Sequence, residues 1–208
     1  MLTSLQKNKI KENRLITSIQ KNIVKIERGE KLRSFFEKFD CFLSLSHYYL
    51  SMRIIGIDPG TAIVGYGVVD YIDGECNLVT SGSIQTDKNL DDASRLCEIE
   101  SDLTVLLKKY EPDVASVEKL FFFKNQKTII TVAQGRGVIL ATLAKFGVKI
   151  FEYTPLQIKM SITGYGKATK PDVAEMVKKL INYTVFPKLD DSADAIAMAV
   201  CHVRSSEV

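Results

Sequence analysis

The stretch "MRIIGIDPGTAIVGYGVVD", residues 52–70, holds two apolar runs separated by a carboxylate and Pro-Gly. The pattern predicts strands Arg53–Asp58 and Ile63–Asp70 joined by a short connection. Asp, Pro and Gly are ordinary turn residues, because Pro fixes φ, Gly accepts positive φ and Asp bonds nearby amides. A carboxylate that ends a buried strand is also held rigidly enough to bind a metal ion. Taken alone the stretch favours the turn, so the rest of the sequence must decide.

The charge of the chain is unevenly distributed. The 208 residues are 46% apolar, which is enough for one ordinary domain with a core. Residues 1–51 carry 10 Lys and Arg against 5 Asp and Glu, a balance of +5, whereas residues 52–208 carry 18 against 20, a balance of −2. A nucleic-acid face would therefore have to be a local basic patch on residues 52–208.

The cysteine pattern and the hydropathy of the chain indicate the cellular compartment of the protein. Four scattered cysteines without a CxxC pair, and only two histidines, disfavour a zinc site and a disulfide framework. No apolar run approaches the roughly 18 residues that a membrane span needs. We therefore expect a cytoplasmic protein with no membrane association.

Residues 1–51 differ in composition from the rest and end in the aromatic-rich segment "FFEKFDCFLSLSHYYLS". Three interpretations remain open: a partly helical basic arm, an organellar presequence, or upstream DNA translated from a misassigned start. The acidic residues weigh against a presequence. We expect residues 1–51 to be a dispensable N-terminal basic extension and residues 52–208 to form the folded domain, because Met52 opens a complete strand signal.

From Met52 onward the pattern is β-β-β-α-β-α-β-α-α. The later elements are expected at Asn77–Gln85 (strand), about Leu96–Tyr110 (helix), 113–119 (strand), about Thr128–Phe146 (helix), 148–153 (strand), a helix with Thr154 as N-cap and Pro155 at its first position, and helices at about Pro171–Ile181 and Asp191–Val203. This order predicts an α/β fold with a five-stranded mixed β-sheet and helices on both faces.

Carboxylates begin or end three of these elements. Glu118 ends its strand as Asp58 does, and a right-handed crossover allows the two strands to lie parallel and adjacent. Asp191 and Asp194 lie three residues apart in the first turn of the last helix. Each acid alone fits a surface or capping role. Four converging carboxylates repel one another unless cations are bound, and oxygen ligands suit Mg²⁺ or Mn²⁺.

Residues 52–204 closely resemble the RuvC family of Holliday-junction resolvases, within the RNase H-like superfamily. The motifs that carry the resemblance are "GIDPGTAIVGYGVV", "SVEKLFFFKNQKT", "AQGRGV", "FEYTPLQIKMSITGYGKATK" and "DDSADAIAMAVCH". The resemblance places the family's four catalytic, metal-binding carboxylates on Asp58, Glu118, Asp191 and Asp194. Small departures occur at Lys119 and Gly135, where many members carry Gln and Ala.

The resemblance also implies an activity. It implies an RNase H-like fold and a symmetric homodimer that nicks two opposing strands of a four-way DNA junction in recombination and repair. The products would be 5′-phosphate and 3′-hydroxyl ends. Two Mg²⁺ ions about 4 Å apart would serve each site, with Mn²⁺ able to substitute and Asp58 as bridging ligand. The RuvA-RuvB branch-migration complex is the implied protein partner.

The resemblance assigns DNA contacts to aromatic and basic residues. Phe121 and Phe122 match positions that contact unpaired or distorted bases, and Lys124, Lys159 and Lys170 match basic positions near the scissile phosphates. An apolar strand-to-helix connection and solvated surface lysines are the plainer alternatives.

The helix that contains "TVAQGRGV" holds the small residues Ala133, Gly135 and Gly137. Glycine inside a helix costs about 1 kcal/mol relative to alanine, so these residues need a reason. Close approach across a dimer axis is the reason that the resemblance supports, and close packing on the sheet is the alternative.

Two alternative functions fit part of the sequence: an RNA nuclease and an ATP-binding kinase. A RuvX/YqgF-type RNase H-like nuclease acting on RNA shares a Gly-rich first hairpin with Asp, but it lacks the "FFFKNQKT", "AQGRG" and "DDSADA" motifs together. An ATP-binding kinase of the actin-like fold would need a second repeat and more chain than residues 52–208 provide.

Overall fold

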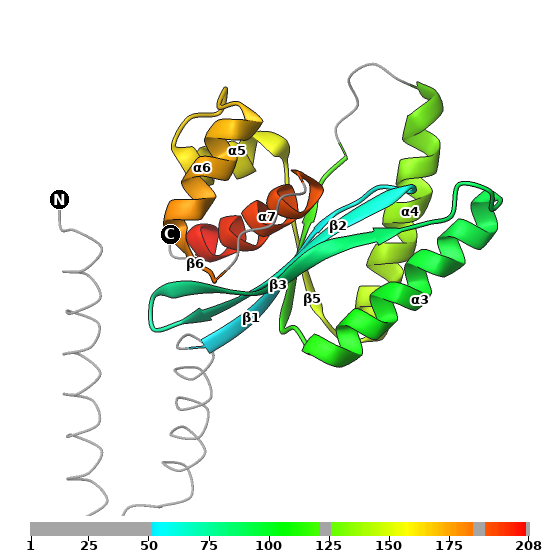
Figure 1. The fold of residues 1–208 in the computed structure, drawn as a ribbon, viewed down its shortest axis with the longest axis horizontal. Coiled ribbons are helices and arrows are strands. Elements are labelled where there is room, and N and C mark those ends of the chain that lie inside the picture. The colour runs from blue at the N-terminus through cyan, green and yellow to red at the C-terminus, as the bar shows by residue number, and fades with distance from the viewer. Residues whose placement is uncertain (1–50, 121–125, 185–189, 207–208) are drawn as a thin grey trace, which may run out of the picture. The chain divides into compact units, whose positions relative to one another are not determined.

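The computed structural model describes residues 51–120, 126–184 and 190–206. The strands are β1 (Ser51–Asp58), β2 (Ile63–Ile72), β3 (Glu75–Gln85), β4 (Val114–Glu118), β5 (Lys149–Tyr153) and β6 (Ile181–Asn182). The helices are α3 (Asp92–Tyr110), α4 (Gln126–Lys145), α5 (Pro155–Thr163), α6 (Lys170–Leu180) and α7 (Asp190–Ser206). The strands form one mixed sheet in the order β5-β4-β1-β2-β3-β6 (Figure 1).

The first hairpin is the antiparallel pair that its sequence predicts. Asp58 is the last residue of β1 and lies opposite Gly65 of β2. Both strands run further than expected at the other end, where Ser51 lies opposite Ile72. The chain then turns into β3 through Asp73 and Gly74, both at positive φ. β1 therefore starts two residues before Arg53, where the sequence predicted its start.

The predicted parallel pairing of β1 with β4 is confirmed. The two strands pair in parallel, with Ile57 opposite Val117, so Asp58 and Glu118 leave the sheet side by side. β5 pairs in parallel with β4 on its other side, with Glu118 opposite Tyr153. The carboxyl ends of three neighbouring strands thus meet at one edge of the sheet.

The predicted strand number was too low by one. β6 pairs in parallel with β3 through Cys76 and Asn77. It spans two residues directly after α6, so it is too short to show an alternating pattern, and Ile181 reads as the end of the helix. The buried Ile181 side chain and a hydrogen bond from Asn182 to Glu75 hold it in place.

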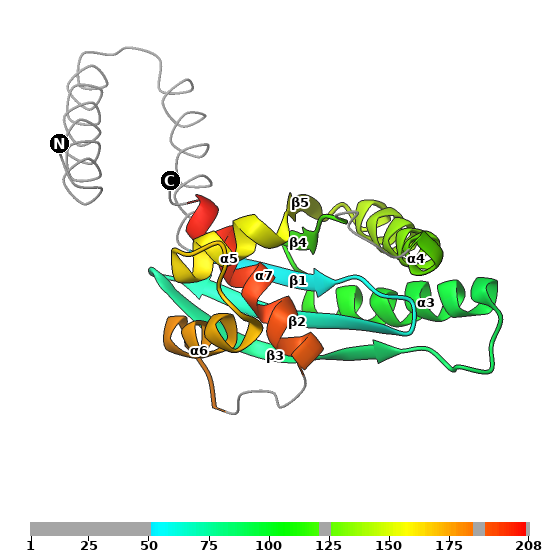
Figure 2. The same ribbon diagram turned by 90° about the horizontal axis from the view of Figure 1, so that it is seen from above.

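Helices cover both faces of the sheet, as predicted. Figures 1 and 2 show α3 and α4 on one face and α5, α6 and α7 on the other. Successive side chains of β1 point to opposite faces of the sheet. Ile54 packs on the face covered by α5, α6 and α7, whereas Ile55 and Ile57 pack on the face covered by α3 and α4.

A glycine pair lets α7 lie directly on the first hairpin. Gly56 and Gly67 face each other across β1 and β2. A Cβ at Gly56 would overlap the carbonyl oxygen of Ala195, and one at Gly67 would lie 2.7 Å from Cγ1 of Ile196. The first turns of α7 are therefore fixed against the backbone of the strand that ends in Asp58.

Two capping boxes set the starts of α5 and α6. The predicted cap Thr154 accepts a hydrogen bond from the Gln157 amide, and Pro155 is the first helical residue. Thr169 and Asp172 cap α6 in the same way, so this helix begins at Lys170, one residue earlier than expected. The cap fixes the backbone from which the Lys170 side chain projects.

Candidate active site

The environment of Glu118 at the end of β4 strongly perturbs its carboxyl group. Burial raises its pKa first, the negative charges of Asp58 and Asp194 raise it further, and a side-chain hydrogen bond with Asp58 adds to this, giving a pKa of about 7. The nearby Lys170 ammonium partly opposes the shift. Three of the four predicted carboxylates therefore influence one another electrostatically, although they come from β1, β4 and α7.

Lys170 lies against one of these predicted ligands. Its Nζ is 2.6 Å from Oδ2 of Asp194. The Lys170 side chain is 72% exposed, whereas that of Asp194 is only 25% exposed. Sequence reasoning expected Lys170 to face DNA and did not foresee this ion pair. Because the lysine is mostly in solvent, it can exchange the carboxylate for another anion at small energetic cost.

The donor chemistry at the strand ends suits a hard divalent cation. The converging side chains offer carboxylate oxygens, which Mg²⁺ and Mn²⁺ prefer. In the described part of the chain no three His, Cys, Asp or Glu side chains already form a metal-binding group. The raised pKa of Glu118 and the Lys170 contact show how the excess negative charge is balanced there. Asp191 lies in the first turn of α7, and its side chain is outside the described residues.

The predicted DNA-contacting residues divide into two groups. Phe121, Phe122 and Lys124 lie outside the described residues. Lys159 lies on α5, where its side chain is half-buried and its carbonyl accepts a hydrogen bond from Thr163. Lys170 begins α6 beside Asp194.

The small residues of α4 do not share one environment. Ala133 is exposed, as is Gly137, and a Cβ at Gly137 would meet nothing within 4 Å. Gly135 is buried, and a Cβ there would lie 3.0 Å from the Gly60 carbonyl oxygen. Close packing against the loop after β1 thus explains Gly135 within a single chain. Ala133 and Gly137 lie on the open face of the helix, where Ile130 is also exposed.

Sequence reasoning missed Arg136. Its Nε donates a hydrogen bond to the carbonyl oxygen of Glu118 at 3.0 Å, and its guanidinium pairs with Glu152 of β5. The arginine stands in the quoted "AQGRGV" motif, but no local pattern indicates that its side chain reaches the end of β4.

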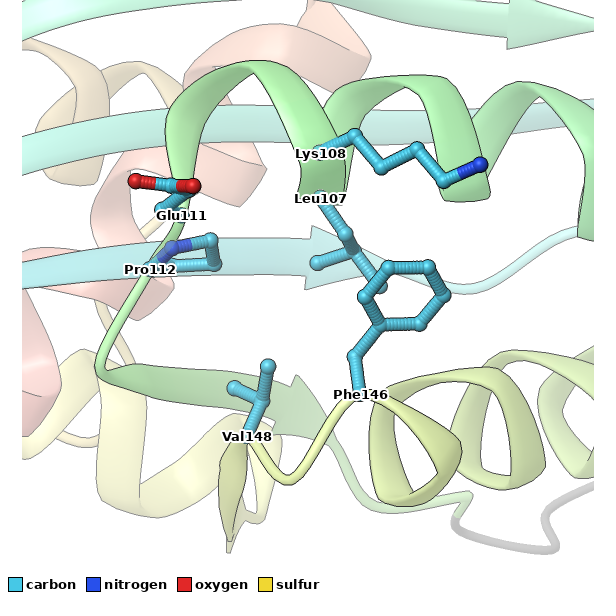
Figure 3. A pocket seen from close by; sticks show the side chains of 6 residues that line it. All are labelled: Leu107, Lys108, Glu111, Pro112, Phe146 and Val148. Atoms are coloured by element: carbon cyan, nitrogen blue, oxygen red, sulfur yellow. The ribbon is translucent and has the colours of Figure 1, made fainter.

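A pocket in the described part of the chain lies elsewhere. Figure 3 shows its lining, which comes from the end of α3, the connection to β4 and the segment after α4: Leu107, Lys108, Glu111, Pro112, Phe146 and Val148. These segments adjoin the first residue of β4, whereas Glu118 is the last. The pocket is therefore at the opposite edge of the sheet from the carboxylates and is not part of the candidate site.

Comparison with known sequences identifies close relatives. Residues 54–202 match the family described as "Crossover junction endodeoxyribonuclease RuvC". A protein of that name from Fusobacterium nucleatum is 47% identical over 154 residues, which cover 74% of this chain and 81% of the relative. A protein of the same name from Caldanaerobacter subterraneus is 45% identical over 157 residues, which cover 76% of this chain and 95% of the relative.

Solved structures show the same fold. The RuvC of T. thermophilus in complex with Holliday junction substrate superimposes with a TM-score of 0.70 at 28% identity, covering 75% of this chain and 95% of that one. The yeast mitochondrial Holliday junction resolvase Ydc2 superimposes with a TM-score of 0.58 at 14% identity, covering 74% of this chain and 79% of that one. Ydc2 therefore shares the fold. The fold, the family match and the sequence relatives agree: the chain belongs to the RuvC family of crossover junction endodeoxyribonucleases.

Proposed function

We propose that this protein resolves four-way DNA junctions in homologous recombination and repair by nicking two opposing strands, leaving 5′-phosphate and 3′-hydroxyl ends. The observation that carries the proposal is the convergence of Asp58 and Glu118 at adjacent parallel strand ends, with Asp194 near enough to help raise the pKa of Glu118 to about 7. The names of the relatives favour junction DNA over the RNA substrate of a RuvX/YqgF-type enzyme.

We propose that Asp58, Glu118, Asp191 and Asp194 hold two Mg²⁺ ions, with Mn²⁺ able to replace them. When bound, such ions supply an activated water and stabilise the leaving 3′-oxygen of an in-line displacement. The sheet keeps Asp58 and Glu118 in fixed positions because each ends a paired strand. Glu118 must be ionised to act as a ligand, and Lys170 must release Asp194, which its exposed side chain permits.

The proposed DNA contacts rest on the resemblance of this chain to the RuvC family and, for Lys170 alone, on its ion pair with Asp194. We assign base contacts to Phe121 and Phe122 and backbone contacts to Lys124, Lys159 and Lys170. A strand phosphate would give Lys170 an anionic partner in place of Asp194, which couples binding of the strand to release of that carboxylate.

A homodimer completes the proposal, because two copies related by a two-fold axis supply two sites of opposite orientation. Ala133 and Gly137 on the open face of α4 would form the contact, with Gly135 packed beneath them. The RuvA-RuvB branch-migration complex is the proposed partner. Among the described residues no helix is both long and apolar enough to cross a membrane. We propose a cytoplasmic location.

A cleavage assay that compares DNA and RNA substrates tests the proposed function. The full chain is incubated with a synthetic four-way junction, the matching linear duplex and a structured RNA, with MgCl₂, MnCl₂ or EDTA. We expect paired, ligatable nicks in the junction alone, and none in EDTA. Preferential cleavage of the RNA would instead support the RuvX/YqgF-type activity.

Near-isosteric variants test the four carboxylates. Asp58→Asn, Glu118→Gln, Asp191→Asn and Asp194→Asn should each lose cleavage by at least about 100-fold while junction binding in a gel-shift assay survives, because the amides remove ligand charge and leave the basic contacts intact. A variant that cleaves at the wild-type rate identifies a residue that is not a ligand.

A further inference from the structure

We propose that Arg136 is a positioning residue for the nuclease reaction: it holds the main chain at Glu118 and couples α4 to that carboxylate. The inference rests on the proposed function, because it matters only where Glu118 is a metal ligand.

The contacts of Arg136 join three elements. Arg136 lies on α4, its Nε donates to the Glu118 carbonyl oxygen of β4 at 3.0 Å, and its Nη2 pairs with the carboxylate of Glu152 on β5. The Arg136 side chain is 16% exposed and that of Glu152 is 36% exposed, so these contacts are partly shielded from water. A planar guanidinium can satisfy both acceptors at once, whereas a lysine ammonium has no second nitrogen for such a bridge.

The hydrogen bond from Arg136 to the Glu118 carbonyl oxygen lies at the end of β4. Glu118 is the last residue of β4, and the following Lys119 amide donates to the Tyr153 carbonyl oxygen at 2.8 Å. The chain then leaves the sheet, so the main chain of Glu118 stands where sheet pairing ends. Arg136 adds a side-chain clamp at that point. Catalytic groups need placement within about 0.5 Å, and a misplacement of about 1 Å can cost 100-fold in rate.

The same helix carries the residues assigned to assembly. Arg136 is flanked in sequence by Gly135 and Gly137, and Gly137 lies on the open face of α4. A change in the position of α4 on dimerisation or DNA binding would therefore act on the Glu118 main chain through one side chain. Arg136 thus gives the proposed assembly surface a direct contact with the catalytic strand end.

Three variants and a matched control test the proposal. R136Q removes the ion pair and the guanidinium fork, R136K keeps the charge, and E152Q removes the partner on β5. R53Q is the control, because Arg53 likewise pairs with a carboxylate, Asp70, at 2.7 Å and donates to a carbonyl oxygen, that of Tyr110, at 3.0 Å. These contacts lie at the start of β1, away from the carboxylates.

Two measurements distinguish positioning from general stability. Hydrogen exchange of the Lys119 amide in the metal-free protein reports on the end of β4, and single-turnover cleavage is measured against Mg²⁺ concentration at saturating junction. For R136Q we expect Lys119 exchange to accelerate about tenfold or more and cleavage to fall about 10–100-fold, with a higher Mg²⁺ requirement and unchanged junction affinity. R136K should lie between R136Q and wild type. R53Q should lower the Tm and leave both measurements unchanged.

The outcomes separate this inference from the proposed function. Wild-type exchange and Mg²⁺ dependence in R136Q overturn the inference, as does an equal loss in R136Q and R53Q at matched Tm. Weaker junction binding with normal cleavage at saturation overturns it in favour of a DNA contact. If R136Q does not fold, R136K decides by the same two measurements, because it keeps the charge but cannot bridge the Glu118 carbonyl oxygen and Glu152. Glu118→Gln is assayed in parallel, and cleavage by that variant contradicts the proposed function itself.

Discussion

Burial and neighbouring negative charges both act on the carboxyl group of Glu118. Its pKa is about 7 in the folded chain, against an ordinary value of 4.5, first because it is buried and then because Asp58 and Asp194 are close. Between these two pH values the folded protein binds more protons than the unfolded protein. Stability must therefore fall as pH rises through this window, and the loss is complete above pH 7. A cation bound at the site would oppose this shift, because its positive charge favours the ionised carboxylate.

We accordingly predict that the free energy of unfolding of wild type minus that of Glu118→Gln decreases between pH 5 and pH 7.5 in EDTA, by about 1–3 kcal/mol after allowance for solvent screening. Urea titrations at each pH measure the difference. The subtraction is needed because burial lowers the pKa of His202, which acts with the opposite sign. With saturating Mg²⁺ we expect the decrease to vanish, and a flat difference in EDTA would contradict the environment described for Glu118.

At the scale of elements, the position of α7 depends on the backbone of two strands. Gly56 and Gly67 leave no space for a Cβ beneath Ala195 and Ile196. We predict that Gly56→Ala destabilises the fold by about 1–3 kcal/mol or more, because α7 must shift outward to relieve the overlap. It should also reduce cleavage, since Asp194 precedes Ala195 directly.

Thermal unfolding and the junction-nicking assay check this prediction. Ser83→Ala is the control, because Ser83 lies on β3, opposite Gly65 of β2, and the change removes only its hydroxyl, which accepts one hydrogen bond, from the exposed Gln85 side chain. If Gly56→Ala keeps the wild-type Tm and nicking rate, the close contact between β1 and α7 does not position the site.

Local chemistry explains which elements were predictable from the sequence. Thr154 with Pro155 marks the start of α5 through contacts within a few residues. The strand ends at Asp58 and Glu118 follow from apolar runs that stop on an acid. Periodicity therefore gave the order of elements and the edge where the carboxylates meet.

Contacts between distant residues were not predictable in this way. Lys170 and Asp194 are 24 residues apart, and Arg136 lies 18 residues from Glu118. Neither pair leaves a spacing pattern, because each depends on how a helix packs against the sheet. The two-residue strand β6 was missed for a related reason, since its pairing with β3 stabilises it rather than its own sequence.

For the whole molecule, the open face of α4 is the proposed dimer contact. We predict that Ala133→Glu and Gly137→Glu each convert the protein to a folded monomer, because both positions are exposed in the single chain and a buried charge opposes association. The Tm should fall only by what dimerisation contributed. Light scattering after gel filtration measures the mass, and paired nicking of a junction should be lost.

The matched control on the same helix is Gly135→Glu, which should lower the Tm further, since Gly135 packs against Gly60 within the chain. Dimers that persist in both exposed variants would place the interface on another surface.

The last prediction concerns residues 1–50. Among the described residues, strand pairing begins at Ser51, opposite Ile72, and the buried apolar residues run from Ile54 to Val203. Residues 50–208 form a compact unit. We therefore predict that deletion of residues 1–50 leaves the Tm and the junction-cleavage rate unchanged. Deletion of residues 1–51 removes only one exposed terminal pair and should cost little more. Thermal melts and nicking assays on both truncated proteins check this, and loss of solubility or of cleavage in the shorter deletion would make the N-terminal segment part of the working enzyme.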